Sequence, residues 1–100
     1  MDIVNAIAKV RFSSARPQRV QLYKFAGLAC ELICLEPGQE LPSEDKCAYY
    51  VIAGSGDVRA GKEGGPIAMG KLAACGNGDP HAVINSSEQR LICLAISRQS

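Results

Sequence analysis

The chain of 100 residues carries a formal net charge of +1, and 47% of its residues are hydrophobic. A chain of this length forms one domain that can bury a core without disulfide or metal staples, and its 21% of charged residues argues against disorder. No apolar run approaches the roughly 18 residues of a membrane span, and residues 1–5 lack the basic and apolar regions of a secretory signal. We therefore expect a cytoplasmic protein with no membrane partner.

The first half of the chain predicts one helical turn followed by strands. Residues 2–8 indicate a short helix with Asp2 as its N-cap. Residues 20–25 alternate between apolar and polar side chains, as in a strand with one buried face. Residues 28–36 are apolar on both faces, which is typical of a strand covered on both sides. A polar connection, residues 41–46, leads into the second half.

The second half consists of short apolar segments separated by glycine, proline and asparagine. Residues 61–65 predict the turn of a hairpin, and residues 71–75 lead into a second dense turn at residues 76–80. Strands of this length and spacing predict an antiparallel sandwich or barrel. The expected strands in this half are residues 49–52, 58–60, 66–68, 81–84 and 90–96.

Basic residues are concentrated near the start of the chain, where Asp2 is the one acidic residue among the first 25. They alternate with apolar residues and lack clustered aromatic partners, so a solvated strand face explains them better than a nucleic-acid-binding arm. We expect no nucleic-acid partner. The basic residues are Lys9, Arg11, Arg16, Arg19 and Lys24.

Five cysteines are many for a chain of this length. Their odd number and the lack of a C-x-x-C pair argue against a disulfide framework. Most of them stand in apolar runs, where a free cysteine packs as a small hydrophobic residue. We expect buried thiols at Cys30, Cys34, Cys47, Cys75 and Cys93.

A set of residues late in the chain resembles the second sequence motif of the cupin family, G-x5-P-x-G-x2-H-x3-N. Gly70, Gly78, His81 and Asn85 match fixed positions of this pattern, and Gly76 stands where the pattern has proline. Four of the five fixed positions therefore agree.

The first cupin motif, G-x5-H-x-H-x3,4-E-x6-G, is only partly present. Residues 35–40 resemble its beginning in single-domain cupins, and residues 49–56 resemble its end. The loop between them, residues 41–47, contains no histidine and is several residues too short. Cys47, seven residues before Gly54, stands where the family has its glutamate ligand.

The resemblance spans residues 20–98 and is to small single-domain cupins of the cupin 2 type. It implies an all-β fold, an antiparallel β-barrel that is also described as a double-stranded β-helix or jelly roll. One domain then occupies residues 1–100, with an N-terminal arm at residues 1–19 and the barrel at residues 20–98. Small cupins commonly pair through an outer sheet face, and the apolar segments 28–35 and 91–96 fit such a homodimer face.

Most metal ligands of the family are missing from this sequence. The family uses two histidines and a glutamate of the first motif and a histidine of the second, and only His81 carries over. Since a catalytic metal site needs three protein ligands, we expect no metal cofactor. The alternative is a rebuilt set of His81, Cys47 and Glu44, whose sulfur ligand would favour zinc or iron.

His81 is the only histidine, and the resemblance implies that it points into the barrel. Some cupin epimerases and isomerases use a histidine as base without a metal, which makes His81 the candidate catalytic residue. Such an imidazole needs an orienting partner, for which the sequence offers Asp79, Tyr49, Arg59 and Arg90. The alternative is a strand residue that is hydrogen-bonded and inert.

Without the metal ligands, the resemblance leaves a barrel mouth suited to a small apolar or uncharged molecule. We therefore expect a small-ligand-binding or sensory domain rather than an enzyme. The alternative is a cupin enzyme of isomerase or oxygenase type built around His81 and Cys47, which gains support if residues 43–47 fold toward His81. The expected ligand-pocket residues are Tyr49, Val51, His81, Val83 and Cys47.

Overall fold

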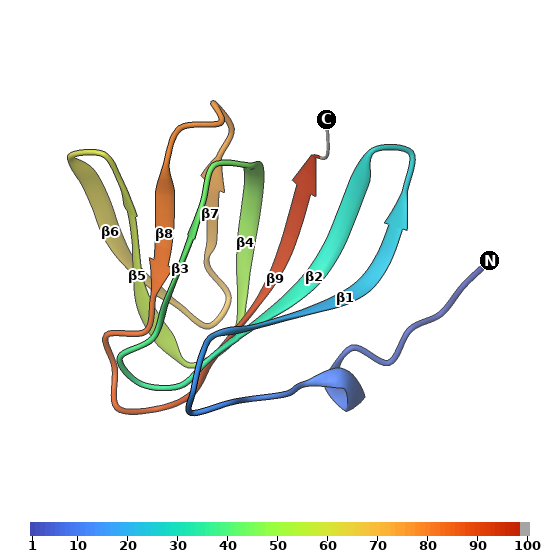
Figure 1. Cartoon of the computed structure of the whole chain (residues 1–100), viewed down its shortest axis with the longest axis horizontal. Coiled ribbons are helices and arrows are strands. Elements are labelled where there is room, and N and C mark those ends of the chain that lie inside the picture. The colour runs from blue at the N-terminus through green and yellow to red at the C-terminus, as the bar shows by residue number, and fades with distance from the viewer. Residues whose placement is uncertain (99–100) are drawn as a thin grey trace.

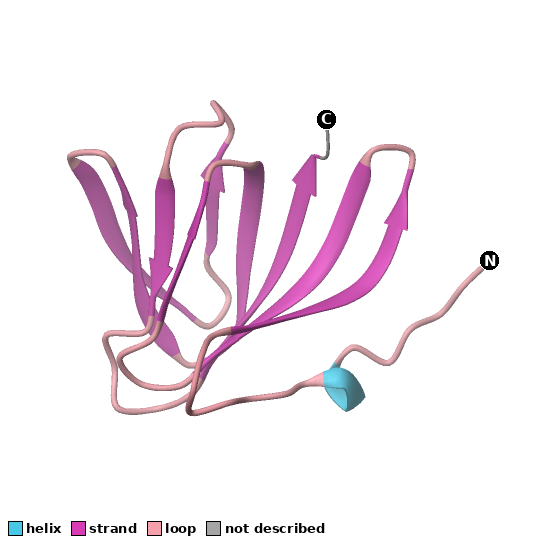
Figure 2. Cartoon of the chain, viewed as in Figure 1, coloured by secondary structure: helices cyan, strands magenta, loops and turns pink. Residues whose placement is uncertain are grey.

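The computed structural model describes residues 1–98, and almost all regular structure in them is β-strand (Figures 1 and 2). One turn of 3-10 helix, η1 (Ile7–Lys9), precedes the strands. No helix in this part of the chain is long and apolar enough to cross a bilayer. The strands are β1 (Gln18–Phe25), β2 (Leu28–Leu35), β3 (Glu40–Ser43), β4 (Lys46–Ala53), β5 (Ser55–Ala60), β6 (Glu63–Ala68), β7 (Leu72–Cys75), β8 (His81–Ile84) and β9 (Leu91–Arg98).

The strands form two antiparallel sheets. One has five strands in the order β1-β2-β9-β4-β7, and the other has four in the order β3-β8-β5-β6. Each sheet mixes strands from both halves of the chain, as in a jelly roll. Buried residues of both sheets form one cluster, so the sheets pack face to face. The prediction of an all-β antiparallel barrel is confirmed.

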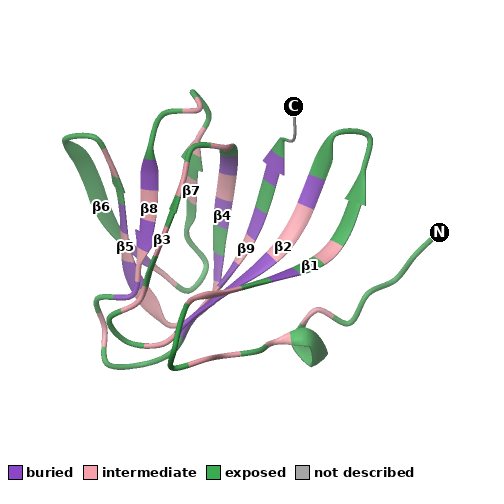
Figure 3. Ribbon diagram, viewed as in Figure 1, coloured by how far each residue is buried: buried purple, intermediate pink, exposed green. Residues whose placement is uncertain are grey.

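Alternation along the strands fills the space between the sheets. In β4 and β9, Tyr49, Val51 and Cys93 point inward and are buried, whereas Tyr50 and Ile96 on the opposite face are each 44% exposed. Buried and more exposed positions alternate along the strands (Figure 3). The inner core consists of Ile33, Leu35, Cys47, Tyr49, Val51, Val58, Ile67, Val83, Leu91, Cys93 and Ala95.

A second, smaller core lies on the outer face of the five-stranded sheet. Val20, Leu32 and Cys34 are buried there, and Val10 and Phe12 from the N-terminal arm pack against them. Strand β2 contributes to both cores, because its successive side chains point to opposite faces. The prediction that β2 is covered on both sides is therefore confirmed.

Polar contacts fasten the arm to the barrel. The side-chain amide of Gln39 donates to the carbonyl oxygen of Ser13 at 2.7 Å. The guanidinium of Arg90 lies 4.4 Å from the ring centre of Phe12 and donates to Glu36 at 2.8 Å. A cation held over an aromatic face in this way is attracted by the ring quadrupole, so these contacts hold the arm over the second core.

The helix prediction for the arm is wrong in position. The helical turn is Ile7–Lys9 rather than residues 2–8, and Asp2 does not cap it. The Asp2 carboxylate instead accepts a hydrogen bond from the Tyr23 hydroxyl at 2.9 Å, which connects the start of the arm to β1.

Two predictions about connections are also wrong. The predicted polar connection at residues 41–46 contains β3, because Glu40–Ser43 pairs with the distant strand β8. The predicted hairpin turn at residues 61–65 is shorter, since Glu63, Gly64 and Gly65 already pair with β5. Tertiary pairing thus extends strands into segments whose composition is typical of turns.

The asparagine of the second cupin motif has a structural role. Asn85 is fully buried, and its amide donates to the carbonyl oxygens of Leu35 at 3.0 Å and Gln89 at 2.7 Å. Its side-chain oxygen accepts bonds from the amide and hydroxyl of Ser87. These bonds join the end of β2 to the β8–β9 connection and so fix the position of β8, whose other end begins with His81.

Candidate functional site

A hydrogen bond between the two sheets lies inside the barrel. Tyr49 on β4 and His81 on β8 both point inward and are only 2% and 5% exposed. The Tyr49 hydroxyl oxygen lies 2.7 Å from His81 Nε2. The two rings meet edge to face, with 5.6 Å between their centres. A strand from each sheet is therefore needed to assemble this pair.

The second nitrogen of His81 determines which tautomer the neutral ring adopts. Nδ1 lies 2.9 Å from the carbonyl oxygen of Asp79, and a carbonyl oxygen can only accept. Nδ1 must therefore carry the proton, which leaves Nε2 as the acceptor for the Tyr49 hydroxyl. Both ring nitrogens are thus satisfied inside the protein.

Two further side chains surround the phenol. Ser43 lies directly opposite His81 in the β3–β8 pairing, and both Ser43 and Cys47 interact with the Tyr49 hydroxyl. Burial, followed by the neighbouring Cys47, raises the pKa of Tyr49 far above its ordinary value. The phenol therefore stays neutral and acts as a donor. Segment 43–47 meets His81 through Ser43, while the Glu44 side chain is exposed.

The part of the barrel interior around Tyr49 has almost no free space. Val51 and Val83 have no exposed surface and belong to the inner core. Cys47 and Tyr49 line a cavity of about 10 Å³, which is at most the space of one water molecule. His81 instead borders an open depression that it shares with Pro42, Ser43, Glu44 and Pro80. The five expected pocket residues therefore do not line one common pocket.

An ion pair covers the small cavity. Arg19 on β1 and Glu31 on β2 line it, and a guanidinium nitrogen lies 2.8 Å from the Glu31 carboxylate. Asp45 and Ser97 also line this cavity. The basic residue Arg19 therefore lies over the small cavity and is paired with Glu31.

Segment 41–47 carries three side chains at the spacing of the first cupin motif. Leu41, Ser43 and Cys47 reproduce the H-x-H-x3-E spacing, and all three contact the barrel interior. These three side chains offer an apolar group, a hydroxyl and a thiol.

The alternative metal ligands, His81, Cys47 and Glu44, do not form a metal site in the described part of the chain. Within residues 1–98, no three or more His, Cys, Asp or Glu side chains come together in a group that could hold a metal ion. Cys47 is buried, and burial raises the pKa of its thiol. His81 already uses both ring nitrogens, and Glu44 is exposed. Within residues 1–98, His81, Cys47 and Glu44 therefore do not come together as ligands of one metal ion.

Of the four expected orienting partners, Tyr49 is the one whose side chain contacts the His81 ring. Asp79 contributes its backbone carbonyl rather than its carboxylate. Arg59 and Arg90 lie elsewhere on the surface, where they pair with Glu40 and Glu36.

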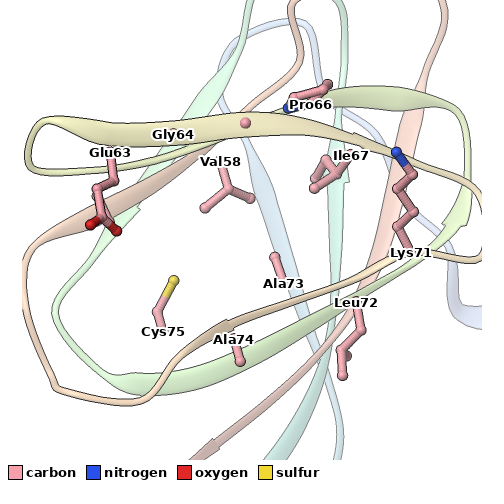
Figure 4. A pocket seen from close by; sticks show the side chains of 12 residues that line it. Val58, Glu63, Gly64, Pro66, Ile67, Lys71, Leu72, Ala73, Ala74 and Cys75 are labelled. Atoms are coloured by element: carbon pink, nitrogen blue, oxygen red, sulfur yellow. The ribbon is translucent and has the colours of Figure 1, made fainter.

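A groove that the sequence did not predict lies where the two sheets end. Strand β6 is the last strand of the four-stranded sheet and β7 the last of the five-stranded sheet. Between them is a groove of about 320 Å³. Val58 and Ile67 point into it from one side and Ala73 and Cys75 from the other, whereas Ala74 points away (Figure 4).

The groove widens toward the β7–β8 turn. A second space of about 720 Å³ shares Ala60, Glu63, Ala74 and Cys75 with it and continues to Pro80. Lys71 stands at the other end, where the chain passes from β6 to β7. The sequence signal that accompanies this groove is its small residues, Gly64-Gly65 and Ala73-Ala74, which leave room between the two strands.

The Tyr49–His81 bond predicts a specific loss of stability. In Tyr49→Phe, Nε2 of His81 stays buried without its donor, so the free energy of unfolding should fall by about 1–3 kcal/mol. The matched control is Tyr50→Phe, which alters a phenol on the exposed face of the same strand and should change the value by less than about 0.5 kcal/mol. Urea denaturation measures both, and equal effects of the two substitutions would contradict the assigned bond.

Neither a protein-family model nor a curated protein matches the sequence. Solved structures do match. A protein of Thermus thermophilus is 24% identical, with a TM-score of 0.91 over 99% of this chain and 98% of that one. A cupin 2 conserved barrel domain protein of Salinispora arenicola is 15% identical, with a TM-score of 0.78 over 100% and 90% of the two chains.

A third match is a proposed sugar phosphate isomerase of Acidithiobacillus ferrooxidans, which is 26% identical with a TM-score of 0.66. The match covers 82% of this chain and 60% of that one. Together with the sheet order and the second motif, these similarities identify the architecture: the chain has the fold of the cupin 2 barrel proteins.

Proposed function

We propose that this cupin barrel binds a small, largely apolar and uncharged molecule without a metal, in the groove between β6 and β7. The observation that carries the proposal is the contrast in free space. The groove offers about 320 Å³, whereas the cavity beside Tyr49 offers about 10 Å³. Sites for small molecules have volumes of roughly 300–1,000 Å³ and mainly apolar walls. The groove meets both conditions.

The chemistry of the groove supports an uncharged ligand. Its floor is formed by Val58, Ile67 and Ala73, which offer no charge or strong hydrogen-bonding group. Glu63 and Lys71 stand near opposite ends (Figure 4). One carboxylate and one ammonium at the rim leave the floor neutral, so a molecule with an apolar body and a few polar substituents matches it best.

The free edges of β6 and β7 supply the polar groups that would orient a ligand. Each strand is hydrogen-bonded on one side only, to β5 and β4 respectively. Backbone N–H and C=O groups on the other side therefore point toward the groove and can bond to polar substituents. The wider space beside the β7–β8 turn provides the route of access.

An isomerase-type enzyme is the second candidate, and the Tyr49–His81 pair favours it. A neutral imidazole that accepts from a phenol is a possible proton acceptor, and one structurally similar protein is described as a proposed sugar phosphate isomerase. The two rings are, however, buried and hydrogen-bonded to each other. A substrate would have to displace the Tyr49 hydroxyl, so we place ligand binding first.

Filling the groove should abolish binding. Neutral metabolites are screened by ligand-observed NMR, and the hits are titrated by calorimetry against two matched variants. Ala73→Leu places a larger side chain in the groove and should weaken binding at least about tenfold, because it occupies space that the ligand needs. Ala82→Leu adds the same side chain on β8, outside the lining of the groove, and should leave the affinity unchanged. A screen without hits, or hits insensitive to Ala73→Leu, would contradict the proposal.

We also propose that two copies pair through the outer face of the five-stranded sheet. Leu72, Tyr50 and Ile96 stand on this face at 65%, 44% and 44% exposure, beyond the part that the N-terminal arm covers. Cross-strand pairing brings Tyr50 next to both Leu94 and Leu72, so the apolar side chains are contiguous. A second copy would present the same surface, as a twofold dimer requires.

Light scattering tests this pairing at concentrations of tens of micromolar. The wild-type mass should be that of a dimer. Ile96→Asp should shift the mass to that of a monomer, because it places a charge in the centre of the paired face. Met69→Asp, at an exposed apolar residue in the β6–β7 turn, should leave the dimer intact. A monomeric wild type, or equal effects of the two variants, would contradict the pairing.

A further inference from the structure

Two of the five cysteines face each other across neighbouring strands. Cys47 on β4 is the direct partner of Cys75 on β7. No other pair of cysteines is matched in this way within residues 1–98, because Cys30, Cys34 and Cys93 lie opposite residues other than cysteine. The arrangement is therefore specific to one pair.

Both thiols also lie on the same face of the sheet. Cys47 belongs to the inner core, and Cys75 packs against that core. Directly opposed residues of antiparallel strands have Cα atoms about 4.5 or 5.5 Å apart, and both values lie within the range of about 4.4–6.8 Å found for disulfides. Strand β7 has four residues and is paired on one side only, so it can adjust its position when the bond forms.

Access differs between the two sulfur atoms. Cys75 is half-buried and points its sulfur into the groove, where a small molecule can reach it (Figure 4). Cys47 is 8% exposed and lies behind it. Cys34 and Cys93 have no exposed surface, and burial raises the pKa of Cys93 to about 12. The pair thus offers one accessible thiol with a second thiol beside it.

We propose that Cys47 and Cys75 form a reversible disulfide when the protein meets a small-molecule disulfide. The Cys75 thiolate attacks one sulfur of the oxidant, which gives a mixed disulfide on Cys75 and releases one thiol. The Cys47 thiolate then attacks the Cys75 sulfur, forms the protein disulfide and releases the second thiol. Two protein thiols are oxidised and one molecule of disulfide is reduced to two thiols, so atoms and electrons balance.

The structure sets the pH dependence of this reaction. Burial is the main cause that raises the pKa of both Cys47 and Cys75 above the ordinary thiol value. Because the thiolate is the attacking species, the reaction is slow near neutral pH and accelerates as the pH rises. At Cys47 the side chains of Tyr49 and Arg19 lower the pKa, whereas Cys75 and Asp45 add to the increase that burial causes.

The cross-link would change the groove described above. It would join β7, which forms one wall of the groove, covalently to β4. The Cys75 sulfur, which now points into the groove, would turn toward Cys47 in the core. An effect of the cross-link on ligand binding rests on the proposed ligand site, whereas the formation of the cross-link does not. Failure of the cross-link and failure of ligand binding are therefore separate outcomes.

The test uses the folded chain and oxidised glutathione. After incubation at mildly alkaline pH, the remaining thiols are alkylated and the protein is mapped by mass spectrometry without reduction. The expected product has lost two hydrogen atoms, contains a peptide cross-link between Cys47 and Cys75, leaves Cys30 alkylated and returns to five thiols with dithiothreitol. Retention of five thiols in the wild type, or a cross-link between other cysteines, would overturn the proposal.

Two variants separate the steps. Cys47→Ala lacks the second thiol, so it should accumulate a glutathione mixed disulfide on Cys75 and form no cross-link. Cys30→Ala, which removes a half-buried cysteine from the other side of the sheet, should behave as the wild type does. A cross-link that survives Cys47→Ala or disappears in Cys30→Ala would also overturn the assignment. The cross-link map of the wild-type protein decides whether the Cys47–Cys75 disulfide forms, even if one of the variants does not fold.

Discussion

The hydrogen bond between Tyr49 and His81 decides what the interior of this barrel can do. It joins the two sheets at 2.7 Å and uses Nε2 of His81, while the carbonyl of Asp79 holds Nδ1. A buried polar group must have a partner, and this pair satisfies itself without a metal or a ligand. The cavity beside the pair is therefore only about 10 Å³. The packed core leaves no room there for a bound ligand.

With this part of the interior packed, the space for a small molecule lies at the edges of the sheets. Each sheet has two edge strands, and two of these four, β6 and β7, face each other across the groove. Small residues on both strands leave space between them, and this space is the groove. The same place contains the accessible thiol of Cys75 and, behind it, Cys47. Ligand binding and thiol chemistry would therefore act on one short strand, β7.

The sequence predicted the strands well where local pattern and burial agree, as in β2, which is apolar on both faces because it serves both cores. It failed at β3, whose polar residues form a strand only through pairing with β8, about forty residues away. For the site, the second motif singled out His81, but Tyr49 was one of four possible partners because its contact depends on two sheets meeting. The groove was missed because a sequence does not reveal which strands end the sheets.

The protonation pattern of His81 is the most direct measurement, since the chain has a single histidine and its ring gives one set of NMR signals. Long-range ¹⁵N–¹H spectra at mildly alkaline pH should show the proton on Nδ1 and an unprotonated Nε2 that accepts a hydrogen bond, unchanged by one equivalent of zinc. A proton on Nε2, or ring signals that shift when zinc is added, would contradict a barrel closed by the Tyr49–His81 bond.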